Sequence, residues 1–239
     1  RSRRIENRKW AGILAVVFMF VFGGVEAQAQ QPKKIPRIGY LTAQTSSAEF
    51  PRIDAFRQGL RALGYVEGQN IAIEYRSMDG KLERLPEVAA ELVRLKVDVL
   101  IPISTNAALA AKRATSTVPI FFMGVSNPVE VGLVESLARP GGNITGLTNI
   151  ASVLSGKRLE VLKETIPKLS RVAVLWDPQN PGSAAQWKES EIAAKELRLQ
   201  IYSTQVSSAD KYESAFKAAT RAGSMALAVT LSPLAASNQ

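Results

Sequence analysis

The sequence predicts a two-lobed α/β protein in which each lobe is a parallel sheet flanked by helices. Two features support this fold class: 46% of the 239 residues are hydrophobic, and short apolar runs alternate with stripes of apolar residues at helical spacing. Alternating strands and helices indicate parallel sheets with helices on both faces. The strand segments are nearly continuous apolar runs, as burial on both faces of a sheet requires.

The first series of elements runs from residue 37 to residue 148. Strands are expected at 37–42, 70–75, 97–101, 118–123 and 144–148. Helices are expected between them, at 50–63, 82–95, 106–114 and 129–137. The helices are assigned from apolar residues three and four positions apart, and Gly64 and Pro140 mark two of their ends. We expect Tyr40, in the first strand, to be a core residue.

A second series follows with fewer strands. Strands are expected at 171–176, 199–204 and 225–229, and helices at 159–166, 183–197 and 209–222. Trp176 and Trp187 are expected to be core residues of this series. We place the two lobes at residues 30–148 and 149–239, and expect the second lobe to be truncated because no closing helix follows its last strand.

The first 29 residues have the layout of a secretory signal peptide. Basic residues from Arg1 to Lys9 precede an apolar run from Trp10 to Phe22, and small residues end at Ala29. The run is shorter than the ~20 residues that span a bilayer, so we expect cleavage after Ala29 and a periplasmic protein. An uncleaved N-terminal anchor is the alternative.

Composition excludes several kinds of chemistry. The chain has no His and no Cys, which removes catalytic triads, thiolate nucleophiles and most zinc sites. We expect no metal, no cofactor and no catalytic residue. The formal charge of +9 comes from 30 basic and 21 acidic residues, without a dense basic run after the first segment, so no nucleic-acid partner is expected.

Polar residues follow the predicted strands, where parallel sheets bind ligands and helix N-termini favour anions. The candidate ligand-binding residues are Thr42, Gln44, Ser104, Thr105, Asn106, Ser126, Asn127, Asp177, Asn180 and Thr230. Ser232 occupies a similar place after the last strand. Ser104 is also a plausible N-cap, so capping alone remains an alternative to ligand binding there.

Five segments carry a resemblance to a known family. They are Ala-Leu-Gly-Tyr-Val-Glu-Gly-Gln-Asn-Ile at 62–71, Leu-Pro-Glu-Val-Ala-Ala-Glu-Leu-Val at 85–93, Leu-Ala-Arg-Pro-Gly-Gly-Asn-Ile-Thr-Gly at 137–146, Val-Ala-Val-Leu-Trp at 172–176 and Asn-Pro-Gly at 180–182. They resemble the substrate-binding proteins of ABC transporters, in the branch that binds aromatic amino acids such as tryptophan. The resemblance runs from Arg37 to the last residue. It implies a type I periplasmic binding fold with a hinge, an interlobe cleft and an ABC permease as partner.

The chain departs from this family at three positions. Family members often have Asp-Pro where this chain has Asn127-Pro128 and Ser232-Pro233, and both changes remove a potential partner for a ligand ammonium group. Pro102 stands where a small residue is common. These departures leave open whether the ligand is an amino acid.

The function expected from residues and resemblance together is a non-enzymatic receptor that delivers a small organic ligand, an amino acid or related carboxylate, to the permease. Contact with the membrane is expected only through the permease or an uncleaved signal segment. One alternative is an α/β transferase that uses carboxylates, although among the strand ends only Asp177 supplies one. Another is the ligand-sensing core of a transcription regulator, which would need a DNA-binding helix pair at the N-terminus.

Overall fold

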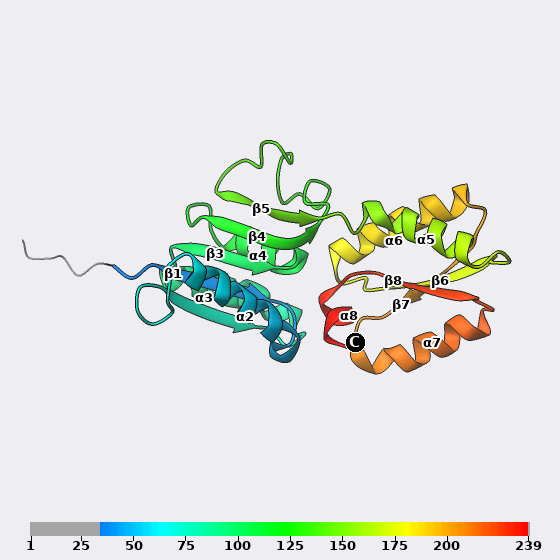
Figure 1. Ribbon diagram of the computed structural model, residues 1–239, viewed down its shortest axis with the longest axis horizontal. Coiled ribbons are helices and arrows are strands. Elements are labelled where there is room, and N and C mark those ends of the chain that lie inside the picture. Colours follow the sequence, from blue (N-terminus) through cyan, green and yellow to red (C-terminus); the bar gives the residue numbers. More distant parts are fainter. Residues whose placement is uncertain (1–33, 239) are drawn as a thin grey trace, which may run out of the picture. The chain divides into compact units, whose positions relative to one another are not determined.

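The computed structural model describes residues 34–238, and the predicted signal peptide at 1–29 lies outside this part of the chain. Two parallel sheets with flanking helices confirm the predicted fold class (Figure 1). The first sheet has the strand order β2-β1-β3-β4-β5. Its strands are β1 (Arg37–Thr42), β2 (Ala72–Ser77), β3 (Val99–Ile103), β4 (Ile120–Ser126) and β5 (Ile144–Asn149).

The helices of the first sheet cover both of its faces. They are α2 (Ser46–Ala62), η1 (Leu82–Arg84), α3 (Leu85–Arg94) and α4 (Thr105–Ala114). On one face, α3 and α4 bury a cluster that includes Leu92, Leu100 and Ala108. On the other face, α2 packs Ile53 and Phe56 against the sheet. The predicted core residue Tyr40 belongs to this second cluster and is 2% exposed.

The second sheet has the order β7-β6-β8 and is also parallel. Its elements are α5 (Val153–Thr165), β6 (Arg171–Trp176), α6 (Pro181–Glu196), β7 (Gln200–Gln205), η2 (Ala209–Lys211), α7 (Tyr212–Arg221), β8 (Ala226–Val229) and α8 (Pro233–Ser237). Residues of α5 and α6 form the core on one face, and α7 covers the other face, as Figure 1 shows. We call residues 37–149 the first half and residues 153–237 the second half.

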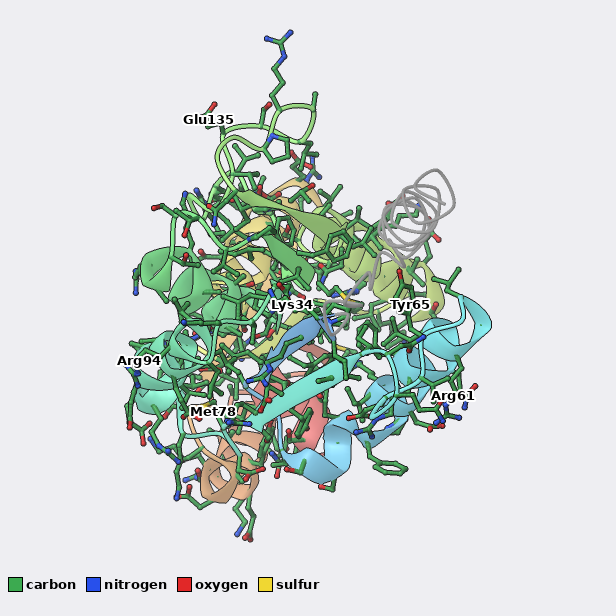
Figure 2. All side chains as sticks on the ribbon, turned by 90° about the vertical axis from the view of Figure 1, so that its left-hand side faces the viewer. Lys34, Arg61, Tyr65, Met78, Arg94 and Glu135 are labelled. Carbon is green, nitrogen blue, oxygen red and sulfur yellow. The ribbon has the colours of Figure 1, made fainter. Side chains whose placement is uncertain are left out.

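The predicted helix at 129–137 is wrong. This segment forms turns, because Asn127 and Gly132 both have positive φ (46° and 68°) and the backbone cannot continue as a helix. Leu133 and Val134 are buried next to each other, so the apolar spacing that resembles a helix serves a compact loop instead. Glu135 marks this exposed loop in Figure 2.

Each sheet contains one point at which the strand order reverses. In the first sheet it lies between β1 and β3, and in the second between β6 and β8. Ligands of open parallel sheets bind beyond the carboxyl ends of the strands at such points. A ligand site is therefore expected at the loops that begin at residues 43, 104, 177 and 230.

Within residues 34–238, no helix is both long enough and apolar enough to cross a membrane.

Candidate functional site

A cavity of about 440 Å³ lies at these strand ends and is lined from both halves. The first half contributes residues from the ends of β1, β3, β4 and β5 and from α2, and the second half contributes the loops after β6 and β8. The volume falls in the range of small-molecule sites. The lining residues are Tyr40, Gln44, Arg52, Ala55, Phe56, Ile103, Ser104, Thr105, Met123, Gly124, Ser126, Asn149, Asn180, Leu231, Ser232 and Pro233.

Helix α4 begins at this cavity with a strained residue. Ser104, its N-cap, has φ 101° and ψ 161°, a backbone conformation that residues other than glycine rarely adopt. Its N–H donates to the Met123 carbonyl (3.0 Å), and its Oγ accepts from the Ala107 N–H at a long 3.4 Å. The first N–H groups of a helix lack intrahelical acceptors and lie at the positive end of the dipole. The amides of Thr105 and Asn106 are therefore suited to bind an anion.

The N-terminus of α6 approaches α4 from the second half. Asn180 is its N-cap, and the side-chain Oδ1 accepts from the Ser183 N–H at 2.9 Å. Gly182, in the first turn, is so close to α4 that a Cβ there would lie 2.7 Å from Thr105 Oγ1. The absence of a side chain at Gly182 is what permits this approach.

Hydrogen bonds join the two halves beside the cavity. Asn106 Nδ2 donates to the Gln179 carbonyl at 3.0 Å, and Asn180 Nδ2 donates to Asn106 Oδ1 at 2.9 Å. Farther out, Lys188 pairs with Glu130 at 3.1 Å. The first two bonds connect the N-termini of α4 and α6, so moving these two helix ends apart would break them.

A buried carboxylate lies below the cavity in the first half. Glu49 is 0% exposed and accepts hydrogen bonds from the Tyr40 hydroxyl (2.6 Å) and the Thr42 hydroxyl (3.1 Å). Arg52 adds an ion pair at 3.4 Å. A buried charge is tolerated when it is paired and hydrogen-bonded in this way. Burial and the bond to Glu49 raise the pKa of Tyr40 far above its ordinary value, so the Tyr40 hydroxyl stays a donor.

Arg52 connects this network to the cavity. Its side chain is half exposed, lines the cavity, and donates from Nη1 to Gln44 Oε1 at 2.6 Å. Its Nε and Nη2 groups make no hydrogen bond with the described residues. A guanidinium with free N–H groups is a good partner for a carboxylate.

The rest of the cavity wall is mainly apolar. Phe56, Ile103, Met123 and Leu231 supply large side chains. Phe56 also contacts the Tyr40 ring, with centroids 5.7 Å apart. Such a wall suits the apolar body of a ligand, whereas the helix N-termini and Arg52 suit a polar end.

The structure brings five of the predicted site residues to the cavity. These are Gln44, Ser104, Thr105, Ser126 and Asn180. Thr42 and Asn106 are not among the lining residues: the Thr42 side chain binds Glu49, and the Asn106 side chain binds the loop before α6 beside the cavity.

The other three predicted residues do not line this cavity. The Asn127 side chain bonds to Glu130 within its own loop. Asp177 accepts from the Gln179 N–H at 2.9 Å and is 5% exposed. Thr230 bonds to the Ser183 hydroxyl at 2.6 Å and lines a second cavity of about 560 Å³. Each of these side chains is used to stabilise a turn or a helix start.

Several lining residues were not predicted from the sequence. Arg52 and Phe56 lie inside α2, about two and three turns after its start, and therefore away from the strand ends where ligand-binding residues were expected. Asn149 holds Ser126 through a 2.7 Å hydrogen bond from the serine hydroxyl. One feature of the sequence could have indicated them: Glu49 and Arg52 stand three residues apart on a helix face that is otherwise apolar.

The lining can offer a ligand hydrogen bonds and one ion pair. The lining polar groups are hydroxyls, amides and one guanidinium. Among residues 34–238, no three Asp, Glu, His or Cys side chains lie where they could hold a metal ion.

Two parallel sheets whose strand-end loops line one cavity define a two-lobed α/β architecture. The family model of ABC transporter substrate binding proteins matches residues 47–238, and the chain belongs to this family.

Individual proteins are also similar to this chain. A tyrosine-binding protein of Clostridioides difficile (strain R20291) is 32% identical over 171 residues, which cover 70% of this chain and 49% of that protein. A crystal structure of a conserved domain protein from Vibrio cholerae is 26% identical with a TM-score of 0.76, covering 81% of this chain and 64% of that one.

A third comparison supports the fold alone. The structure of an ABC domain in complex with L-Trp from Streptococcus pneumonia is 22% identical with a TM-score of 0.77, covering 86% of this chain and 68% of that one. The present chain spans about half the length of the tyrosine-binding protein and about two thirds of the two solved structures.

Proposed function

We propose that this chain is the solute-binding part of an ABC importer and takes a small organic ligand, an amino acid or related carboxylate, into the cavity between its halves. The observation that carries the proposal is the pair of helix N-termini, α4 and α6, that meet at one cavity and are joined by the Asn106 and Asn180 hydrogen bonds. Hydrogen-bond donors from both halves would then bind the same ligand.

Closure of the halves would complete the binding. Binding proteins of this architecture trap a ligand by hinge motion, and the ligand stabilises the closed form. The bonds at Asn106 and Asn180 are the contacts expected to form on closure. The permease would recognise the closed form and receive the ligand from it.

The relatives suggest the chemical class of the ligand. One is a tyrosine-binding protein, and another was solved with L-Trp. An apolar wall with Phe56 and Met123 fits a ligand of this kind, and Arg52 with the amides of α4 would hold its carboxylate. The protein would bind this ligand without converting it.

The expected placement of the protein follows from the same function. Residues 1–29 would direct export as a signal peptide, and the lobes at 30–148 and 149–239 would work in the periplasm. Delivery to the permease requires this location, because importers collect their ligands outside the inner membrane.

A thermal-shift screen of amino acids and small carboxylates tests the proposal. A ligand at a hundredfold excess over its Kd is expected to stabilise the fold by about 2.7 kcal/mol. Phe56→Ala should reduce this ligand-induced shift. Phe50→Ala, on the same helix but 64% exposed and outside the cavity, should leave it unchanged. The receptor proposal fails if no solute stabilises the protein while one of them is chemically converted.

A further inference from the structure

We infer that the cavity selects an apolar carboxylate that carries no ammonium group, in preference to the corresponding amino acid. This inference rests on the proposed function, because it assumes that the cavity is the ligand site. Its basis is the balance of charge and of hydrogen-bonding groups among the described residues around the cavity.

The charge of the lining is one-sided. Among the described residues that line the cavity, Arg52 is charged and none is acidic. A carboxylate ligand would meet a guanidinium and the positive ends of α4 and α6. An ammonium group in the same space would meet no opposite charge and would lose its hydration, which is costly for a buried ion.

The nearest carboxylate cannot serve as the missing partner. Glu49 is 0% exposed, and both of its oxygens are already bonded. Oε1 accepts from the Tyr40 hydroxyl, and Oε2 accepts from the Thr42 hydroxyl and pairs with Arg52. Glu49 therefore has no oxygen left to accept from a ligand ammonium group, and its charge balances part of the charge of Arg52.

The amide oxygens of the lining are also occupied. Asn149 Oδ1 accepts from the Ser126 hydroxyl (2.7 Å) and the Ala151 N–H (3.1 Å). Gln44 Oε1 accepts from Arg52 at 2.6 Å. Asn180 Oδ1 accepts from the backbone at the start of α6.

The two lining serines that cap helices are similarly engaged. Ser104 Oγ accepts from the Ala107 N–H, and Ser232 Oγ accepts from the Ala235 N–H at 3.1 Å. The cavity thus keeps donors available at Arg52 and at the first amides of α4, while its side-chain acceptors are largely consumed. An anion fits this arrangement, and a zwitterion leaves its ammonium unsatisfied.

Matched pairs that differ only by the ammonium group test the inference by isothermal titration of the purified protein. The pairs are 3-phenylpropionate with L-phenylalanine, 3-(4-hydroxyphenyl)propionate with L-tyrosine, and indole-3-propionate with L-tryptophan. We expect at least one pair to bind, with the ammonium-free member at least about tenfold tighter, because a desolvated ammonium without a partner is strongly disfavoured.

The possible outcomes separate this inference from the proposed function. Equal or tighter binding of the amino acids overturns the inference and leaves the receptor function standing. Binding only of solutes without a carboxylate overturns the inference and the carboxylate class of the ligand, and leaves solute binding itself standing. If no pair member and no other amino acid, carboxylate or sugar binds, the proposed function fails and the inference fails with it.

A charge introduced into the lining sharpens the test. Ser232→Asp keeps an N-cap residue at α8, since Asp caps helices as well as Ser does, and places a carboxylate at the cavity. We expect it to shift the affinity ratio by about tenfold toward the amino acids, through an ion pair with the ammonium. Ser47→Asp, exposed and outside the lining, is the matched control and should leave the ratio unchanged. An unchanged ratio in a folded Ser232→Asp protein counts against the inference.

Arg52 provides an independent readout. Arg52→Gln should weaken binding of 3-phenylpropionate by about tenfold or more, because a charge-assisted bond is lost, and should hardly affect the neutral 3-phenylpropionamide. Arg52→Lys should restore part of the carboxylate affinity. Equal losses for the carboxylate and the amide would show that Arg52 acts only through the fold, and would overturn its role in selection.

Discussion

The two halves of the molecule bury a carboxylate in different ways. In the first half, Glu49 accepts two hydroxyl hydrogen bonds and pairs with Arg52. In the second half, Asp177 accepts one backbone N–H and pairs with no cation among the described residues. Burial therefore raises the pKa of Asp177, and burial, together with the charge of Asp177, raises the pKa of the neighbouring Tyr212. The first half compensates its buried charge, and the second half does not.

The two halves also contribute unequally to the cavity. Most of the cavity lining comes from the first half, including most of its apolar wall and the one charged group among the described lining residues. The second half contributes Asn180 and the segment from Leu231 to Pro233. This difference suggests that the first half is preorganised to hold the ligand body, whereas the second half closes over it. The predictions that follow test this contrast.

The largest expected difference concerns stability. Leu100, in the central strand β3, is 0% exposed, and Leu100→Ala should cost about 2–5 kcal/mol of unfolding free energy through the cavity it leaves. Leu227, in β8, is 37% exposed, so Leu227→Ala should cost less than about 1 kcal/mol. Urea unfolding measures both. If Leu227→Ala lowers the free energy of unfolding as much as Leu100→Ala does, the outer face of β8 is buried in solution.

The second prediction concerns closure. Gly182→Ala places a Cβ 2.7 Å from Thr105 Oγ1, so the N-termini of α6 and α4 must separate. We expect affinity for the tighter member of the phenylalanine and 3-phenylpropionate pair to fall by about tenfold, because the closed state becomes less populated. The unfolding free energy should change little, since the two cores are not involved.

A second substitution checks the cause of this effect. Thr105→Ala removes the oxygen that the new Cβ would meet, and should recover part of the lost affinity in the double variant. If Gly182→Ala binds as tightly as the parent protein, the close approach of α4 and α6 is not a requirement for closure.

The strands and the polar residues at their ends could be predicted from the sequence, and the reasons are local. Ser104 follows an apolar strand and precedes a helix, and this pattern predicts both its role as an N-cap and its position at a sheet edge. Asn180 was expected at a sheet edge as well, but not as the N-cap of α6. All eight strands were likewise expected, because a strand is indicated by a local pattern, an apolar run bounded by turn residues.

The network around Glu49 could not be predicted in this way. Glu49 and Arg52 belong to a helix, and their partners Tyr40, Thr42 and Gln44 belong to the preceding strand and loop. Only the packing of α2 against the sheet brings them together. The prediction of a helix at 129–137 was wrong for a related reason. The positive φ of Asn127 and the burial of Leu133 depend on tertiary contacts.

The third prediction compares the two helix starts. Asn180 caps α6 through a short bond and also bonds to Asn106, so Asn180→Ala should cost about 1 kcal/mol. Ser104 caps α4 weakly and holds a strained backbone. Ser104→Gly should therefore be nearly neutral, because glycine adopts φ 101° without strain. Ser104→Ala, which keeps the strain and loses the cap, should be the less stable of the two in urea unfolding.

The smallest expected effect concerns pH and returns to the two kinds of carboxylate. Because the folded-state pKa of Asp177 is raised, its ionised form disfavours folding at neutral pH, and this cost disappears as pH falls through the raised pKa toward the ordinary value of 3.8. Asp177→Asn, which keeps an oxygen for the Gln179 N–H, should therefore stabilise the protein at pH 7 and lose this advantage at pH 3.5.

Asp79 in the first half gives the opposite sign. The Ser46 backbone N–H, together with the Ser77 hydroxyl, lowers the pKa of Asp79, so its charge favours folding at neutral pH and this contribution is lost as pH falls through the lowered pKa. Asp79→Asn should destabilise the protein at pH 7 and have a smaller effect in acid. Urea midpoints at the two pH values measure both variants. If Asp177→Asn and Asp79→Asn shift stability in the same direction at pH 7, the raised pKa of Asp177 and the lowered pKa of Asp79 do not set the sign of their contributions to folding.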